Sequence, residues 1–165
     1  MGALRILRHL FAEGSARRRF PPRVLDTIGK AIAAGEERHA GQVMFAVEGA
    51  LPAGELMRGR SARERAREVF AHLRVWDTQH NSGVLVYVLL ADRAIEILAD
   101  RGIAAKVDEA EWKSICAQTR QSFIASEFER GAVESVKAVG DILARHFPAD
   151  GSTRTNELPD RPVVL

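Results

Sequence analysis

Residues 81–102, NSGVLVYVLLADRAIEILADRG, decide the fold of this chain. The uninterrupted apolar run 84–91 is typical of a strand that is buried on both faces. Asp92-Arg93 predicts a tight turn into a second strand over 94–99, and Asp100-Arg101-Gly102 predicts another turn. We therefore expect an antiparallel hairpin at the centre of the domain.

Upstream of the hairpin, residues 43–47 (VMFAV) form a second short apolar run, which predicts another buried strand. Ser61 and Glu64 have the spacing of a capping box and predict the start of a helix between the two strands. A strand, a helix and a strand in this order form a right-handed βαβ unit with parallel strands. The sequence thus predicts an α/β fold, in which a βαβ unit plus an antiparallel hairpin make a small mixed sheet covered by helices.

Composition divides the chain of 165 residues into three parts. Residues 1–22 are predicted to be a basic amphipathic segment followed by a linker, because Gly, Ser, Arg and Pro crowd 14–22. Residues 23–148 have the helical and strand patterns of one folded domain. Residues 149–165 are polar and rich in Pro, Gly and Ser, which predicts a flexible tail.

Charge and cysteine content exclude several classes of function. Residues 1–23 contain six arginines and one glutamate, a net +5, whereas the rest of the chain carries −3. The basic character therefore belongs to the N-terminal segment, and we expect no nucleic-acid partner for the body. The single cysteine, Cys116, excludes an intrachain disulfide and a cysteine-based zinc site. The chain has neither a secretory signal pattern nor a membrane-length apolar run, so a cytoplasmic location is expected.

The N-terminal segment has two interpretations that remain open. Leu4, Leu7, Leu10 and Phe11 lie near one face of a predicted helix, and Arg5, Arg8 and His9 lie elsewhere. Such a helix could lie on an anionic membrane surface. The same pattern also fits a terminal helix that is docked on the domain or frayed.

The predicted topology sorts the acidic residues between the two edges of the sheet. Glu48 and Asp92 follow the two parallel strands at their carboxyl ends. Asp100 returns to the opposite edge, which also receives Glu36, Asp77 and Asn81. Carboxylate, amide and backbone oxygens are the ligands that Ca²⁺ or Mg²⁺ prefers. Each of these residues is also common in turns and helix caps, which is the structural alternative.

Several segments together resemble the TPM domain family. These are 83–88 (GVLVYV), 95–97 (IEI) and 100–102 (DRG), together with Glu36 and 39–43 upstream and Trp112 and 123–131 downstream. The resemblance covers about 24–147 and is nearest to a compact cytosolic subgroup of that family. It implies an α/β/α sandwich with an acidic cleft for a divalent metal, Ca²⁺ or Mg²⁺. Some members of the family are acid phosphatases.

The resemblance carries five candidate metal ligands onto this chain, which are Asp77, Asp100, Asn81, Glu36 and Asp92, with Asp77 and Asp100 foremost. Three functions are expected from it and from the residues. The first is a metal-binding interaction or regulatory module with an unidentified protein partner, and the second is a metal-assisted acid phosphatase. The third is a peripheral membrane-associated adaptor that uses residues 1–23. The sequence has no Gly-rich phosphate loop, no Gly-x-Ser-x-Gly and no His-Glu-x-x-His motif.

Overall fold

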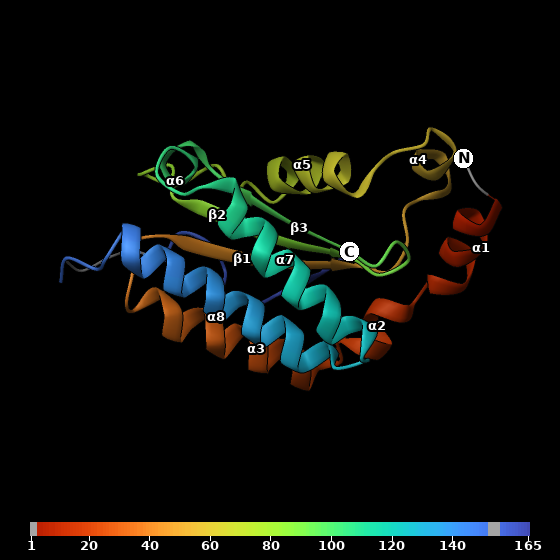
Figure 1. Cartoon of the computed structure of the whole chain (residues 1–165), viewed down its shortest axis with the longest axis horizontal. Helices are drawn as coiled ribbons and strands as arrows, with labels where there is room; N and C mark the ends of the chain where they lie inside the picture. Colours follow the sequence, from red (N-terminus) through yellow and green to blue (C-terminus); the bar gives the residue numbers. More distant parts are fainter. Residues whose placement is uncertain (1–2, 152–155) are drawn as a thin grey trace.

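The computed structural model describes residues 3–151 and 156–165 and contains one four-stranded sheet (Figure 1). The strands are β1 (Gln42–Glu48), β2 (Gly83–Leu89), β3 (Ala94–Ala99) and β4 (Val163–Val164), in the order β3-β2-β1-β4. β1 and β2 are parallel, and β2 and β3 are antiparallel. The predicted βαβ unit and hairpin are therefore confirmed.

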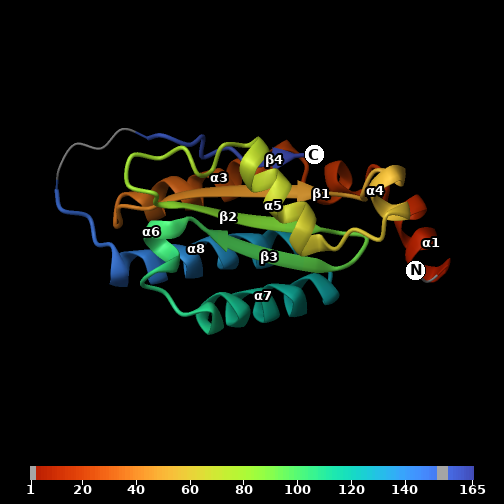
Figure 2. The same ribbon diagram turned by 90° about the horizontal axis from the view of Figure 1, so that it is seen from above.

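Helices cover both faces of this sheet. α3 (Pro22–Glu36), α7 (Glu109–Ile124) and α8 (Phe128–His146) lie on one side, and α5 (Ala62–His72) lies on the other (Figures 1 and 2). Alternate side chains of the strands feed two separate hydrophobic clusters: Phe45 and Val86 belong to the first, Met44 and Leu85 to the second. This is the alternation expected of a pleated strand with two buried faces, and it confirms the α/β/α sandwich.

Local chemistry explains where the helix of the βαβ unit begins. Ser61 Oγ accepts a hydrogen bond from Glu64 N (3.2 Å), and Glu64 Oε2 accepts one from Ser61 N (2.8 Å). The predicted capping box is therefore present at the start of α5. Two short helices flank the sheet, α4 (Ala53–Met57) after β1 and α6 (Arg101–Ala104) after β3.

The beginning of the chain is more ordered than the sequence predicted. α1 (Ala3–Ala12) is followed by α2 (Ser15–Arg19), which occupies part of the expected linker; residues 1–2 lie outside the described part. Phe20 follows α2 and is only 1% exposed, and its ring lies 5.9 Å from that of Phe45. Burial of this aromatic ring packs residues 14–22 against the core. The Arg- and Pro-rich composition of the segment did not indicate this packing.

The end of the chain also differs from the flexible tail predicted for 149–165, of which 152–155 lie outside the described part. Val163 and Val164 form β4, which adds to β1 in parallel. Leu158 is 5% exposed, and Gln42 Oε1 accepts hydrogen bonds from the backbone N–H groups of Glu157 (2.8 Å) and Leu158 (3.0 Å). A strand of two valines is too short to be predicted from sequence. It forms here because the edge of β1 that does not face β2 is free to pair with it.

Candidate functional site

The parallel strands define two edges of the sheet, and the candidate residues divide between them. We call the edge where β1 and β2 begin the amino edge and the edge where they end the carboxyl edge. Ala99 at the end of β3 pairs with Val84 near the start of β2, so Asp100 lies at the amino edge. This is the placement that the sequence predicted for Asp100.

Asp100 is the most unusual of the candidate residues because its carboxylate is buried and only half satisfied. The residue is 7% exposed, and its Oδ1 accepts a hydrogen bond from Arg101 N (2.7 Å) as the cap of α6. Among the described residues, Oδ2 has no hydrogen-bond partner although it is inaccessible to solvent. A buried polar oxygen without a partner costs about 1–3 kcal/mol, and more when it carries charge. A positively charged ligand would remove that cost.

Backbone oxygens of the 80–81 turn lie next to Gly102, two residues after this carboxylate. Asn81 has a left-handed backbone (φ 51°), and its carbonyl oxygen accepts a hydrogen bond from Gly102 N (3.1 Å). A Cβ on Gly102 would lie 2.7 Å from His80 O and 2.8 Å from Asn81 O. The start of α6 therefore packs directly on the 80–81 turn, and only glycine allows the contact. The amino edge combines a carboxylate oxygen with carbonyl oxygens, which is a set of hard ligands.

The other amino-edge candidates already have partners. Asp77, whose side chain is 48% exposed, forms an ion pair with Arg74 (2.6 Å). Glu36 accepts hydrogen bonds from Val43 N (2.8 Å) and from Gln42 Nε2 (3.3 Å) at the start of β1. Burial raises the pKa of Glu36 to about 7, against the effect of the bond from Val43. Glu36 thus anchors the first strand in this structure.

A further acid reaches the amino edge from the end of the chain. Glu157 Oε2 accepts a hydrogen bond from Gln79 N (2.8 Å), in the same turn that carries Asn81. Glu157 was not among the predicted site residues because residues 149–165 were expected to be a flexible tail. Within residues 3–151 and 156–165, no three His, Cys, Asp or Glu side chains gather in a metal-binding arrangement. A cation at this edge would therefore depend on the carbonyl oxygens of the 80–81 turn as well as on Asp100.

Asp92 lies apart from the other candidates, at the carboxyl edge, as the predicted topology required. Its carboxylate bonds Arg5 Nη2 (2.8 Å) and His9 Nε2 (3.1 Å) of α1, and Arg8 Nη2 lies 3.5 Å away. Burial opposes ionisation of Asp92, but the bonds from Arg5 and His9 outweigh it and lower the pKa. Asp92 thus docks the N-terminal helix.

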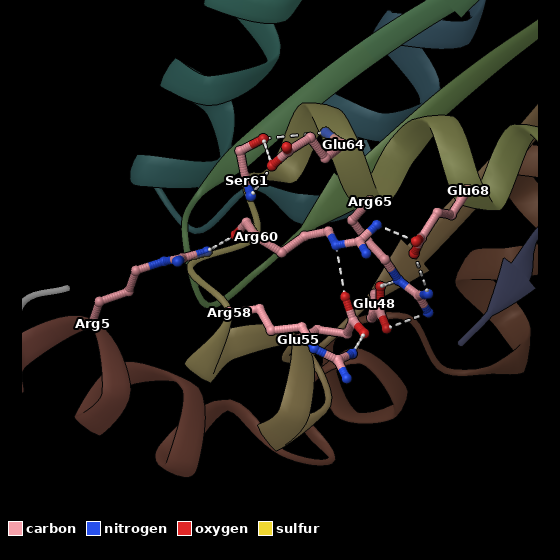
Figure 3. Close-up of polar contacts among 9 residues, drawn as sticks. All are labelled: Arg5, Glu48, Glu55, Arg58, Arg60, Ser61, Glu64, Arg65 and Glu68. Atoms are coloured by element: carbon pink, nitrogen blue, oxygen red, sulfur yellow. Dashed lines mark hydrogen bonds and ion pairs between the residues drawn. The ribbon is translucent and has the colours of Figure 1, made fainter.

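The carboxyl edge also contains a buried ion-pair network (Figure 3). Glu48 is 4% exposed, and Arg65 of α5 bonds both of its oxygens at 2.9 Å. Tyr87 donates its hydroxyl to Glu48 Oε2 (2.6 Å). Burial and the Glu48 charge raise the pKa of Tyr87, so the phenol stays protonated. Glu48 lies at the edge where the sequence predicted it. Arg65 and Tyr87 were not predicted as its partners, because they come from a helix and from the middle of a strand that are distant from Glu48 in sequence.

The network extends outward from Glu48 to the surface. Arg65 also bonds Glu68 (3.3 Å), and Arg60 pairs with both Glu55 and Glu68. The backbone oxygen of Arg60 accepts a bond from Arg5 Nη2 (2.6 Å), which joins the network to α1 (Figure 3). Each charge in this chain of contacts has an opposite charge beside it, so the arrangement holds structure together at the carboxyl edge.

The architecture defines a small α/β/α sandwich whose mixed sheet has a parallel βαβ centre and acidic residues at both edges. The chain belongs to the TPM domain family, whose model matches residues 20–142. It is similar in structure to the BA42 protein of the psychrophilic bacterium Bizionia argentinensis, solved by NMR, with a TM-score of 0.75 and 25% sequence identity. The similarity covers 86% of this chain and 92% of that one. A search of curated proteins gave no match.

Proposed function

We propose that this TPM domain binds a divalent cation, Ca²⁺ or Mg²⁺, at the amino edge and acts as an interaction or regulatory module. The observation that carries the proposal is the buried Oδ2 of Asp100, which has no partner among the described residues. Oxygen ligands of mixed type suit both ions, and Ca²⁺ in particular accepts backbone carbonyls and irregular geometry.

The residues that would hold the cation are Asp100 and Asn81, with Asp77 joining from the loop before β2. Asp77 is exposed, and its ion-pair partner among the described residues is the exposed Arg74, so exchanging that partner for a cation costs little. A cation shared by these residues would connect the end of β3 to the turn that precedes β2. That cross-link would order the surface around the turn, where a protein partner could then bind.

The test is a thermal melting series in CaCl₂ and in MgCl₂. Binding to the native state stabilises it by about 2.7 kcal/mol at a concentration of 100 Kd, so the melting temperature should rise with either salt. Asp100→Asn should reduce the rise, because the amide keeps the cap on α6 but carries no charge. Asp108→Asn is the matched control, since Asp108 caps α7 in the same way from an exposed position.

A rise that is equal in wild type, Asp100→Asn and Asp108→Asn would show that the salts act elsewhere, and no rise at all would refute the proposal. Hydrolysis of phosphomonoesters stays a prediction that the same samples test. Turnover of an aryl phosphate that disappears in Asp100→Asn and persists in Asp108→Asn would add catalysis to binding.

A further inference from the structure

The N-terminal helix α1 contacts the domain through its polar side. His9, the one buried residue of this helix, donates from Nε2 to Asp92 (3.1 Å) and accepts at Nδ1 from Leu51 N (3.0 Å). One turn earlier, Arg5 bonds Asp92 and the backbone oxygen of Arg60. The stripe that holds α1 in place is therefore made of charged and polar groups.

The apolar residues of α1 point to solvent instead. Exposed fractions are 71% for Leu4, 50% for Leu7, 65% for Leu10 and 76% for Phe11. A helix on the surface of a globular domain normally turns its apolar face to the core. Here the orientation is inverted, since the apolar side chains of α1 are exposed. The helix stands at one end of the molecule (Figure 1).

Part of this face continues into a groove that is bordered by arginines. Leu4, Leu7 and Phe11, at helical spacing, line a groove of about 390 Å³ whose opposite wall includes Ile124 at the end of α7. Ile124 is itself 54% exposed. The charged side chains lining the groove are four arginines, with no acidic residue among the described ones: Arg8, Arg18, Arg19 and Arg93.

We propose that this end of the molecule, formed by α1, α2 and the adjacent end of α7, binds an anionic phospholipid membrane. The exposed leucines and Phe11 would enter the boundary between headgroups and acyl chains, and the arginines would lie at the level of the anionic headgroups. Charge complementarity selects this partner over a second copy of the chain. A two-fold contact through this surface would bring one set of four arginines against another.

The docked position of α1 is compatible with membrane binding. The polar stripe of Arg5 and His9 binds the domain, so the apolar residues are available without detachment of the helix. The inference goes beyond cation binding and concerns the carboxyl edge, whereas the proposed cation site lies at the amino edge. One proposal can therefore fail while the other stands.

The experiment is sedimentation of the whole chain with vesicles in the presence of EDTA, which removes any bridging by divalent cations. Vesicles of phosphatidylcholine alone are compared with vesicles that contain one part phosphatidylserine to two parts phosphatidylcholine. We expect binding to the anionic vesicles only, and a decrease with added salt. Replacing two arginines, as in Arg18→Gln/Arg93→Gln, should weaken partitioning by about 30-fold.

Two further variants test whether α1 inserts. Leu7→Gln/Phe11→Gln should lower the partition coefficient at least about tenfold, since it removes two apolar anchors. Both side chains are exposed, so an unchanged melting temperature will show that the variant is folded. Trp76→Gln is the control for an exposed apolar residue, because Trp76 is 49% exposed but lies in the loop before β2 at the other edge.

Wild-type protein that stays in the supernatant with anionic vesicles would overturn the proposal. Binding that Leu7→Gln/Phe11→Gln leaves intact would do the same. So would a stable dimer in analytical ultracentrifugation that this variant dissociates, because the second copy would then be the occupant of the surface. Asp100→Asn should bind vesicles like wild type, which keeps the result separate from cation binding.

Discussion

Replacing Arg65 by Met should destabilise the domain strongly, because it leaves the buried Glu48 carboxylate without its counterion. Glu48 is 4% exposed, and Arg65 supplies two of its bonds, each 2.9 Å long. Removing one partner of a buried pair costs about 3–5 kcal/mol, because the remaining charge is uncompensated. The Arg65 side chain is itself 22% exposed, so water screens part of the effect and we expect the lower end, about 3 kcal/mol.

Urea denaturation gives the free energy of unfolding that this prediction concerns. The matched control is Arg63→Met on the same helix, since Arg63 pairs with Glu96 at 3.2 Å where both side chains are more exposed (39% and 26%). Removing such an exposed ion pair should lower the free energy of unfolding by about 0–1 kcal/mol. Tyr87→Phe should cost about 1.5–3 kcal/mol, more than Arg63→Met, because it removes a hydrogen bond to a charged acceptor. If Arg65→Met lowers the free energy of unfolding no more than Arg63→Met does, the buried pair of Arg65 and Glu48 does not stabilise the fold.

Three further perturbations test separate parts of the structure. Burial raises the pKa of Glu36 from 4.5 to about 7, so the unfolded chain binds fewer protons between these values and stability should fall as pH rises through them. Urea unfolding at several pH values should show this slope, and Glu36→Gln should flatten it. Asp92→Asn should release α1, seen as faster tryptic cleavage after Arg5, with unchanged cleavage arguing that other contacts hold the helix. Gly102→Ala places a Cβ 2.7 Å from a carbonyl oxygen and should cost about 1–3 kcal/mol. Gly54→Ala meets open space within α4 and should instead stabilise slightly, by up to about 1 kcal/mol.

The centre of the fold was predictable because short-range sequence patterns determine its strands, turns and helix starts. The apolar run of β2, the turn at Asp92 and the capping box of Ser61 and Glu64 each act over a few residues, and each is found where the sequence indicated. The parallel pairing of β1 and β2 then followed from the helical crossover that connects them. Placement of Asp92 and Asp100 at opposite edges needed nothing more than that topology.

The two ends of the chain were harder to predict because distant contacts order them. β4 is two residues long and exists through its pairing with Ala46 and Val47, more than 100 positions away. Phe20 is buried by the rings of Phe45, Phe123 and Phe128, which come from three elements. Glu157 lies at the amino edge through a hydrogen bond from Gln79 N, 78 positions away in the sequence. No pattern within these segments encodes such partners.

The two edges of the sheet differ in a way that bears on function. In open α/β sheets, ligands usually bind beyond the carboxyl ends of the parallel strands. In this chain Glu48 and Asp92 at that edge are neutralised by Arg65 and by Arg5, and α1 lies over it. The two acids at the carboxyl edge are therefore neutralised within the chain, and α1 turns its apolar face outward there. Among the described residues, the buried carboxylate oxygen with neither a hydrogen bond nor an ion pair is Asp100 Oδ2 at the amino edge, which is why we propose a cation for that edge and a membrane for the other.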